Sequence, residues 1–268
     1  MVDIPSQQAV MTSETQFPSK IFEKINQRLK SVGDIDMVQL TDQGHQGITF
    51  KMIVDGQSFL IKKTNKVGPI ARGISKSFIQ HEYNIYQKLE GITGIPKCYG
   101  LTDDGCLILE FIEGDSYRKK EHILENRDQF FSHLLSLILS IHDAGVTHGD
   151  LKRKDNILIG DKNQPYLIDF GTAMTISSKN QCIKRWLYNF SKQTDLNAWI
   201  KHKYFRQYDQ ITESDLAYYS SNALDKLIRL TRKFWRTLTL RRFRKQKEQQ
   251  KKEKGQRKKK LLVVDQNK

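Results

Sequence analysis

The sequence has 268 residues, of which 38% are apolar, and its formal net charge is +15. A chain of this length can bury one full core, or two small lobes that share a cleft, but not two large independent domains. No apolar run approaches the ~20 residues of a membrane-spanning helix, and residues 1–20 lack the apolar core of a signal peptide, so we expect a soluble, unsecreted, cytoplasmic protein.

The first part of the chain predicts a small antiparallel sheet with one helix, after a polar leader at residues 1–36. Asp55-Gly56 favours a tight hairpin, because both residues tolerate positive φ. Apolar residues at helical spacing predict a helix over 75–89, which Gly91 would close. Five segments are rich in the β-branched, aromatic and aliphatic residues of strands: 37–40, 48–54, 58–62, 96–101 and 106–112.

The second part of the chain predicts a mainly helical unit. A long helix with an apolar middle is expected over 126–143, followed by short strands at 157–159 and 166–168, and the pattern is helical again from about 190 to 251. We therefore expect an α+β fold with two lobes, 37–114 and 115–222, followed by a basic segment over 223–268.

Two acidic motifs carry the chemistry. The first is His148-Gly149-Asp150-Leu151-Lys152-Arg153-Lys154-Asp155-Asn156, and the second is Asp169-Phe170-Gly171. Taken alone, each could be a polar surface turn. Both occur in order after apolar segments, however, and together they resemble the catalytic loop and the DFG motif of the protein-kinase superfamily. The resemblance implies a bilobal protein-kinase-like fold, with a five-stranded N-terminal lobe carrying one helix and a compact helical C-terminal lobe.

The resemblance also implies roles for the residues of these two motifs. Asp150 would accept the proton of an acceptor hydroxyl, and Lys152 would lie near the transferred group. Asn156 and Asp169 would hold Mg²⁺ on the phosphates of ATP. Phosphoryl transfer requires such positioning and charge neutralisation more than covalent chemistry.

Upstream residues match the nucleotide-binding part of the superfamily. Lys62 at the end of a predicted strand would contact the phosphates, with adjacent Lys63 as the alternative, because strand alternation turns only one of them inward. Glu82 would pair with that lysine, and Glu90 is a poorer choice because it lies close to the end of the helix.

Other positions are assigned by their place in the family pattern. Gly44 and Gly47 lie where a phosphate-covering loop belongs, although two glycines in a hairpin are ordinary. The main chain of Glu110 and Ile112 would lie along the adenine edge, behind which Leu109 would sit. Asp195 is either the buried helix aspartate that holds the catalytic loop or a helix N-cap.

Several departures distinguish this sequence from typical eukaryotic protein kinases. Gly149 replaces the usual arginine, and no Ala-Pro-Glu motif follows Gly171. Five residues separate Asp150 from Asn156 where four are usual, which leaves Asp155 as a second candidate metal ligand. The His148-Gly149-Asp150 loop and the compact C-terminal lobe resemble those of atypical bacterial kinases, namely the kinases of lipopolysaccharide core sugars and the RIO-type family.

The C-terminal segment is strongly basic. From Asp225 to Lys268 there are 18 Lys or Arg residues against four acids, a net +14 of the total +15. The basic amphipathic pattern over 224–260 fits an anionic membrane at the inner face of the cytoplasmic membrane. A lobe-packing helix with a disordered tail is an equal alternative, and nucleic acid is a weaker one.

The function expected from the sequence is ATP- and Mg²⁺-dependent phosphorylation of a hydroxyl on a lipopolysaccharide core sugar or related glycolipid. The alternatives are an atypical RIO-like Ser/Thr protein kinase and a nucleotide-binding pseudokinase. Cys98, Cys106 and Cys182 show no metal-binding spacing, and we expect them to be reduced thiols without a chemical role.

Overall fold

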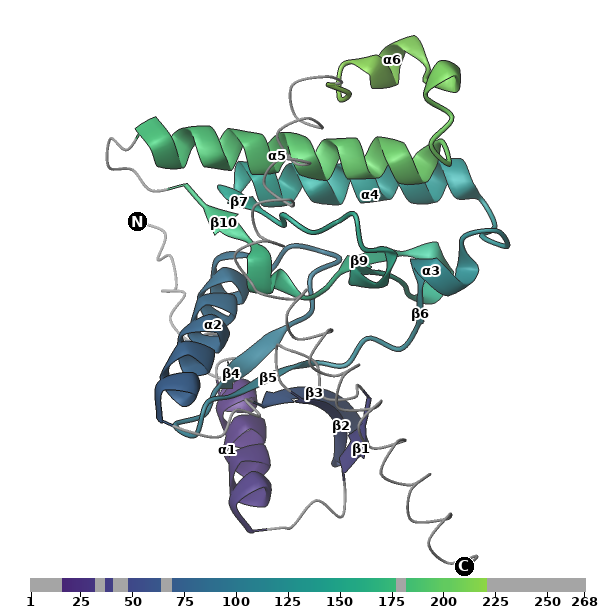
Figure 1. Cartoon of the computed structure of the whole chain (residues 1–268). Coiled ribbons are helices and arrows are strands. Elements are labelled where there is room, and N and C mark those ends of the chain that lie inside the picture. The colour runs from purple at the N-terminus through teal and green to yellow at the C-terminus, as the bar shows by residue number, and fades with distance from the viewer. Residues whose placement is uncertain (1–15, 32–36, 41–47, 64–68, 177–181, 221–268) are drawn as a thin grey trace, which may run out of the picture. The chain divides into compact units, whose positions relative to one another are not determined.

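The structure is a computed structural model that describes residues 16–31, 37–40, 48–63, 69–176 and 182–220 (Figure 1). Met1–Tyr219 form one compact unit and Ser220–Lys268 a second. The predicted basic helix and tail over 223–268, and the membrane contact assigned to 224–260, lie outside the described residues. Among the helices that the structure describes, none combines the length and apolarity required to cross a membrane.

The N-terminal lobe contains the predicted five-stranded antiparallel sheet. Its strands follow the order β1-β2-β3-β5-β4. Asp55 and Gly56 have φ values of 51° and 78°, and they form the predicted tight turn between β2 and β3. The strands are β1 (Met37–Gln39), β2 (Ile48–Val54), β3 (Gln57–Lys63), β4 (Cys98–Leu101) and β5 (Cys106–Glu110).

Helix α1 (Gln16–Ser31) lies within the segment that the sequence predicts to be only a polar leader. Its Ile25 is fully buried, and Ile21, Phe22 and Leu29 pack against the same sheet cluster. A Cβ on Gly100 of β4 would lie only 2.6 Å from the Phe22 ring, so glycine allows this close packing. The apolar face of α1 is narrow, and polar residues surround it in the sequence. The segment therefore reads as polar when judged by composition alone.

Helix α2 (Pro69–Lys88) is the one helix expected between β3 and β4, but it begins six residues earlier than the predicted start at 75. Proline is well suited to the first helical turn because its missing N–H would have no partner there. Ile79, Ile85 and Tyr86 are buried, and they join the main core. This packing fixes the face of α2 that carries Glu82.

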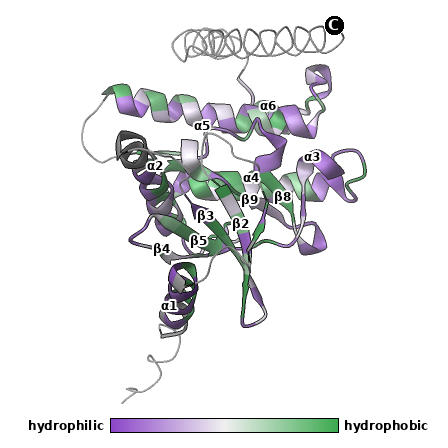
Figure 2. Cartoon of the chain, turned by 60° about the horizontal axis from the view of Figure 1, so that its bottom comes forward, coloured by the Kyte–Doolittle hydropathy of each residue, from purple (hydrophilic) through white to green (hydrophobic). Residues whose placement is uncertain are grey.

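The C-terminal lobe is built around two helices, α4 (Arg127–Asp143) and α5 (Cys182–Lys203). They run side by side and antiparallel (Figure 1), since Tyr188 donates a hydrogen bond to His142 O and Trp199 donates one to Phe131 O. Along its length α5 alternates hydrophilic and hydrophobic residues (Figure 2), as a helix buried on one side does.

Short elements complete this lobe. The catalytic segment lies between β7 and β8, and Asp169 follows β9. These elements are β6 (Asp115–Ser116), α3 (Tyr117–Lys120), β7 (Val146–Thr147), β8 (Ile157–Ile159), β9 (Pro165–Leu167), β10 (Met174–Thr175) and α6 (Glu213–Leu216), with single 3-10 turns at Lys154–Asn156, Asp161–Asn163, Phe170–Thr172 and Tyr208–Gln210.

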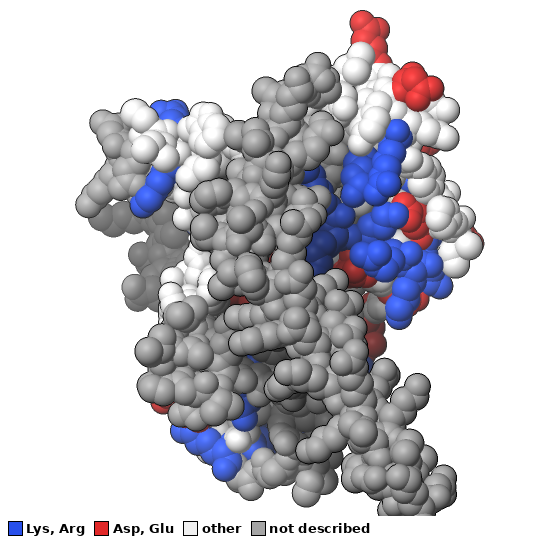
Figure 3. Space-filling model, in the orientation of Figure 1, with Lys and Arg blue, Asp and Glu red and all other residues white. Residues whose placement is uncertain are grey.

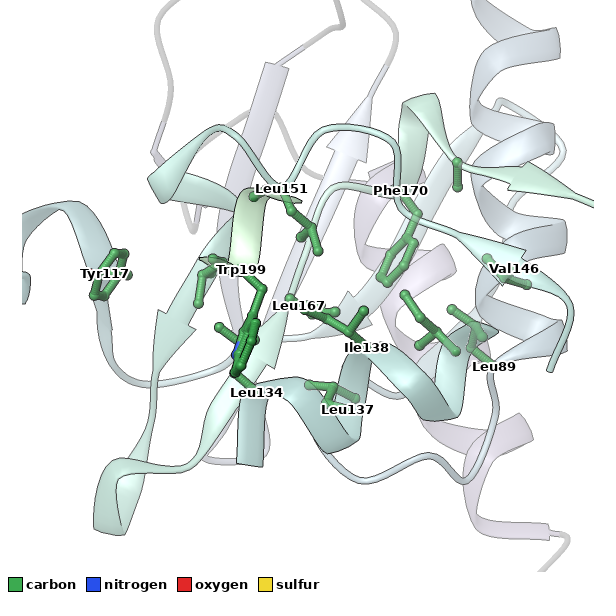
Figure 4. Close-up of a cluster of buried hydrophobic side chains, with 14 of the residues drawn as sticks. Leu89, Tyr117, Leu134, Leu137, Ile138, Val146, Leu151, Leu167, Phe170 and Trp199 are labelled. Carbon is green, nitrogen blue, oxygen red and sulfur yellow. The ribbon is translucent and has the colours of Figure 1, made fainter. Parts of the chain in front are cut away.

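One hydrophobic cluster joins α2, α4, α5 and the short strands (Figure 4). Trp199, Phe170 and Ile138 are almost completely buried in it. Full burial of a side chain of this size contributes about 1.5–3 kcal/mol. The cluster therefore holds the catalytic segment between β7 and β8 against the long helices.

We predict that α1 contributes to the stability of the sheet. Ile25→Ala should lower the free energy of unfolding by about 2–4 kcal/mol, because it leaves a cavity at a fully buried site. As a matched control, Ile123→Ala at a 67% exposed loop position should change it by less than about 0.5 kcal/mol. Urea denaturation measures both, and equal small losses would show that α1 does not stabilise the sheet.

Candidate active site

Lys62 lies on β3 and contacts two carboxylates. Its Nζ is 2.6 Å from Glu82 Oε1 on α2 and 3.1 Å from Asp169 Oδ1 after β9. The Lys62 side chain is 18% exposed, whereas Lys63 is exposed. Phe59 and Ile61 are buried on the opposite face of β3, so strand alternation turns Lys62 toward α2. The structure thus selects Lys62 over Lys63 and pairs it with Glu82.

The two carboxylates keep Lys62 charged, and Lys62 in turn keeps Asp169 charged. Burial lowers the pKa of Lys62, but the Glu82 and Asp169 carboxylates outweigh it and raise that pKa above its usual value. Burial also raises the pKa of Asp169, yet the Lys62 ammonium outweighs it and holds that pKa below its usual value. Lys62 and Asp169 are therefore both charged at neutral pH.

Asp195, on α5, holds the catalytic segment through its backbone. Its carboxylate is fully buried and accepts hydrogen bonds from the backbone N–H groups of His148 at 2.8 Å and Gly149 at 2.9 Å. His142 Nε2 is 3.2 Å away. Asp195 lies inside α5 rather than at its start, so the alternative prediction of an N-cap is wrong and the helix-aspartate prediction is confirmed.

Gly149 stands where typical protein kinases carry arginine, and the backbone here requires glycine. Its φ is +77°, a conformation that other residues rarely adopt. A Cβ would also lie 2.9 Å from Thr172 O and 3.4 Å from Ser191 Oγ. The departure from the family pattern is therefore a structural requirement of this loop.

His148 connects the two acidic motifs, a role that the sequence motifs did not predict. Its Nδ1 accepts a hydrogen bond from Asp150 N at 3.4 Å, so its Nε2 donates to Ile168 O at 3.0 Å. Its ring centroid is 4.7 Å from that of Phe170, and Thr172 Oγ1 donates to His148 O. The position of His148 one residue before Gly149-Asp150 was the available signal.

Asn156 and Asp155, the two candidate metal ligands, have different surroundings in the structure. Asn156 is 3% exposed, and its Nδ2 donates to Asp150 O at 3.1 Å. Asp155 instead accepts from Arg118 Nε at 2.7 and 2.8 Å. Ile168 N donates to Asn156 O at 3.0 Å, which brings Asn156 next to the strand that leads into Asp169.

The oxygens of Asn156 and Asp169 fit a divalent cation. Because Nδ2 of Asn156 is committed to Asp150 O, Oδ1 is the atom that this side chain can offer. Mg²⁺ in phosphoryl-transfer sites takes one or two protein ligands and completes its shell with phosphates and water. Among the described residues, no cluster of three or more His, Cys, Asp or Glu side chains could hold a metal without such help.

Asp150 and Lys152 lie in the loop that these contacts fix. The Asp150 side chain is 33% exposed, with Arg153 Nη1 3.9 Å from its Oδ2, so an acceptor hydroxyl can approach it. Lys152 follows buried Leu151, and its carbonyl accepts from Lys201 Nζ at 3.4 Å. Asp150 and Lys152, the two residues assigned to the transfer step, therefore lie on one loop that these contacts hold in place.

The predicted nucleotide edge lies at the end of β5. Leu109 is fully buried, and both Glu110 N and Glu110 Oε2 form hydrogen bonds with the backbone of Lys97. Ile112 follows two residues later. Gly44 and Gly47 fall outside the described residues, so the predicted phosphate-covering loop stays a prediction.

The chain is similar to known proteins over most of the unit Met1–Tyr219. The protein kinase domain family matches residues 38–195, which is more than half of the chain. A probable serine/threonine-protein kinase, fnkB, from Dictyostelium discoideum is 29% identical over 46% of this chain and 27% of its own length. The negative regulator of sexual conjugation and meiosis from Schizosaccharomyces pombe is 27% identical over 54% of this chain and 33% of its own length.

The EKC/KEOPS complex subunit BUD32 from Encephalitozoon cuniculi is 30% identical over 55% of this chain and 74% of its own length. The chain thus spans about a third or less of the first two relatives and most of the third. These relatives are eukaryotic, and they lend no support to the expected similarity to bacterial lipopolysaccharide kinases.

We predict that His202, which holds the loop through Leu151, makes stability depend on pH. Its Nε2 is 2.9 Å from Leu151 O, and burial lowers its pKa from 6.5 to about 4. Between pH 6.5 and about pH 4, His202 is protonated in the unfolded chain but stays neutral in the folded chain. His202 alone should therefore lower the free energy of unfolding by about 3 kcal/mol as the pH falls through this range.

His202→Gln should reduce the slope of unfolding free energy against pH between 6.5 and 4, measured by urea denaturation at several pH values. Other groups contribute equally to both proteins, so the difference between them isolates His202. Identical slopes would mean that His202 is protonated in the folded state.

Proposed function

The chain belongs to the protein kinase domain family, and we propose that it transfers the γ-phosphoryl group of ATP to a hydroxyl group of a protein. The observation that carries this proposal is the contact of Lys62 with both Glu82 and Asp169. A cation held in this way is oriented to bind a polyphosphate beside the loop that contains Asp150.

Each residue has a defined role in this mechanism. Lys62 binds the phosphates, and Glu82 orients its ammonium group. Asn156 and Asp169 would hold Mg²⁺, which supplies charge neutralisation on the phosphates when bound. Asp150 orients the acceptor hydroxyl and accepts its proton. Lys152 lies near the transferred group.

Positioning residues support this chemistry without touching the substrate. Asp195 fixes the backbone of His148 and Gly149, and His148 ties the loop to Ile168. Preorganised groups of this kind need no rearrangement during the reaction, which is their main catalytic advantage. A nucleotide-binding pseudokinase is the weaker alternative, because the chain keeps Lys62 and Asp150 in this arrangement.

A protein acceptor is favoured by the similarity to a probable serine/threonine-protein kinase. An atypical RIO-like protein kinase is one form of this proposal. The second candidate acceptor is a lipopolysaccharide core sugar or related glycolipid. It is supported by the short chain between Thr172 and Cys182, where α5 begins without an intervening Ala-Pro-Glu motif. Contact of residues 224–260 with an anionic membrane, and a place on the inner face of the cytoplasmic membrane, stay predictions.

The test is transfer of labelled γ-phosphate from ATP into a bacterial lysate separated into protein, lipopolysaccharide and RNA-protein fractions. The full chain should label protein, and Asp150→Ala should reduce that label by at least about a hundredfold, because it removes the acceptor's base. Asp155→Ala is the matched control and should retain most of the activity, since Asp155 pairs with Arg118.

Asp150-dependent label in lipopolysaccharide would replace the protein acceptor by the glycolipid. Nucleotide binding without Asp150-dependent label in any fraction would contradict the proposed transfer and favour the pseudokinase.

A further inference from the structure

Basic side chains gather on the surface around α3 (Figure 3), which contacts the catalytic loop through Arg118 and Asp155. We call this group the α3 basic patch. Its members come from α3 and from the loop after Asp150, and they are Arg118, Lys119, Lys120, Arg153 and Lys154.

The patch lies next to the acceptor position because α3 is tied to the catalytic loop. Arg118 Nε contacts both carboxylate oxygens of Asp155, one residue before Asn156. Arg153 Nη1 is 3.9 Å from Asp150 Oδ2. An acceptor that reaches Asp150 therefore approaches these cations.

Carboxylates neutralise only part of the patch. Arg118 and Lys154 each have a partner of their own, in Asp155 and Glu121. Lys119 and Lys120, by contrast, share the single carboxylate of Asp115, at 3.6 and 3.5 Å.

The patch therefore keeps an excess positive charge at its exposed end. The side chains of Lys119, Lys120 and Arg153 are 73%, 43% and 53% exposed, so this charge is accessible.

We propose that the α3 basic patch selects acceptors with negative charge beside the hydroxyl, specifically protein segments in which Asp or Glu residues flank the Ser or Thr. Lys119, Lys120 and Arg153 would bind those carboxylates while Asp150 takes the hydroxyl. The inference rests on the proposed protein-kinase function and adds the chemical class of its substrate. Charge complementarity of this kind raises the association rate and sets the register of a bound peptide.

An ordinary solvated helix end explains the patch less well. Cations at a helix C-terminus are favoured by the helix dipole, but α3 has only four residues, so its dipole is small. A solvated face also does not require the loop after Asp150 to add two consecutive basic residues, Arg153 and Lys154, to those of α3.

The experiment measures the binding of two fluorescein-labelled Ser peptides to the full chain by fluorescence anisotropy. One peptide has Glu at the flanking positions, and the other has Gln there. The patch variant is Lys119→Gln with Lys120→Gln. The control variant is Lys184→Gln with Arg185→Gln, which removes the same charge from exposed positions on α5 and leaves the basic C-terminal segment intact.

The Glu peptide should bind more tightly than the Gln peptide. The patch variant should weaken the Glu peptide roughly fivefold, the loss expected for two exposed ion pairs, and leave the Gln peptide unchanged. The control variant should change neither. The preference should shrink as NaCl is raised from about 0.05 to 0.5 M, because salt screens exposed charges.

Equal binding of both peptides, or an equal loss in the two variants, would overturn the inference. Phosphoryl transfer to the same peptides separates it from the proposed function. A preserved Glu preference in binding without Asp150-dependent transfer would contradict the proposed function and leave the patch inference supported. Equal Asp150-dependent transfer to both peptides would contradict the patch inference alone.

Discussion

The ammonium group of Lys62 is the constraint on which the site depends. It contacts carboxylates that lie 20 and 107 positions away in the sequence, on α2 and after β9. A buried charge is strongly destabilising unless a partner compensates it. The sheet, α2 and the segment at Asp169 must therefore come together correctly for this charge to be satisfied, and the same contacts leave a cation positioned for phosphate.

Asp195 is the corresponding anchor in the other lobe. Its fully buried carboxylate takes two backbone N–H groups of the catalytic loop, and His142 lies against it from α4. Within the loop, His148 forms a hydrogen bond with the Ile168 carbonyl, and the Asn156 side chain donates one to the Asp150 carbonyl. Catalytic geometry is thus carried by buried polar contacts, while the hydrophobic cluster around Trp199 holds the helices that supply them.

Much of the fold follows from local signals, but the site depends on contacts that are distant in sequence. The hairpin at Asp55-Gly56 and the strand of Lys62 could be predicted, because turn residues and strand alternation act locally. Helix α1 could not be predicted, because its few apolar residues are recognised as a buried face only when they pack against the sheet. The sequence allows two roles for Asp195, because its burial against the loop arises only in the folded chain. The requirement for glycine at position 149 likewise arises only in the folded chain, where Thr172 and Ser191 lie close to it.

The most direct test of this account compares Lys62→Met with Lys63→Met in the full chain, measuring Asp150-dependent transfer of labelled phosphate and checking folding by circular dichroism. The account predicts a loss of about a hundredfold or more for Lys62→Met, the effect of removing one preorganised electrostatic contact. Lys63→Met should stay within about twofold, because this exposed neighbour is turned to the other side of β3. Equal losses in the two folded variants, or full activity in Lys62→Met, would contradict it.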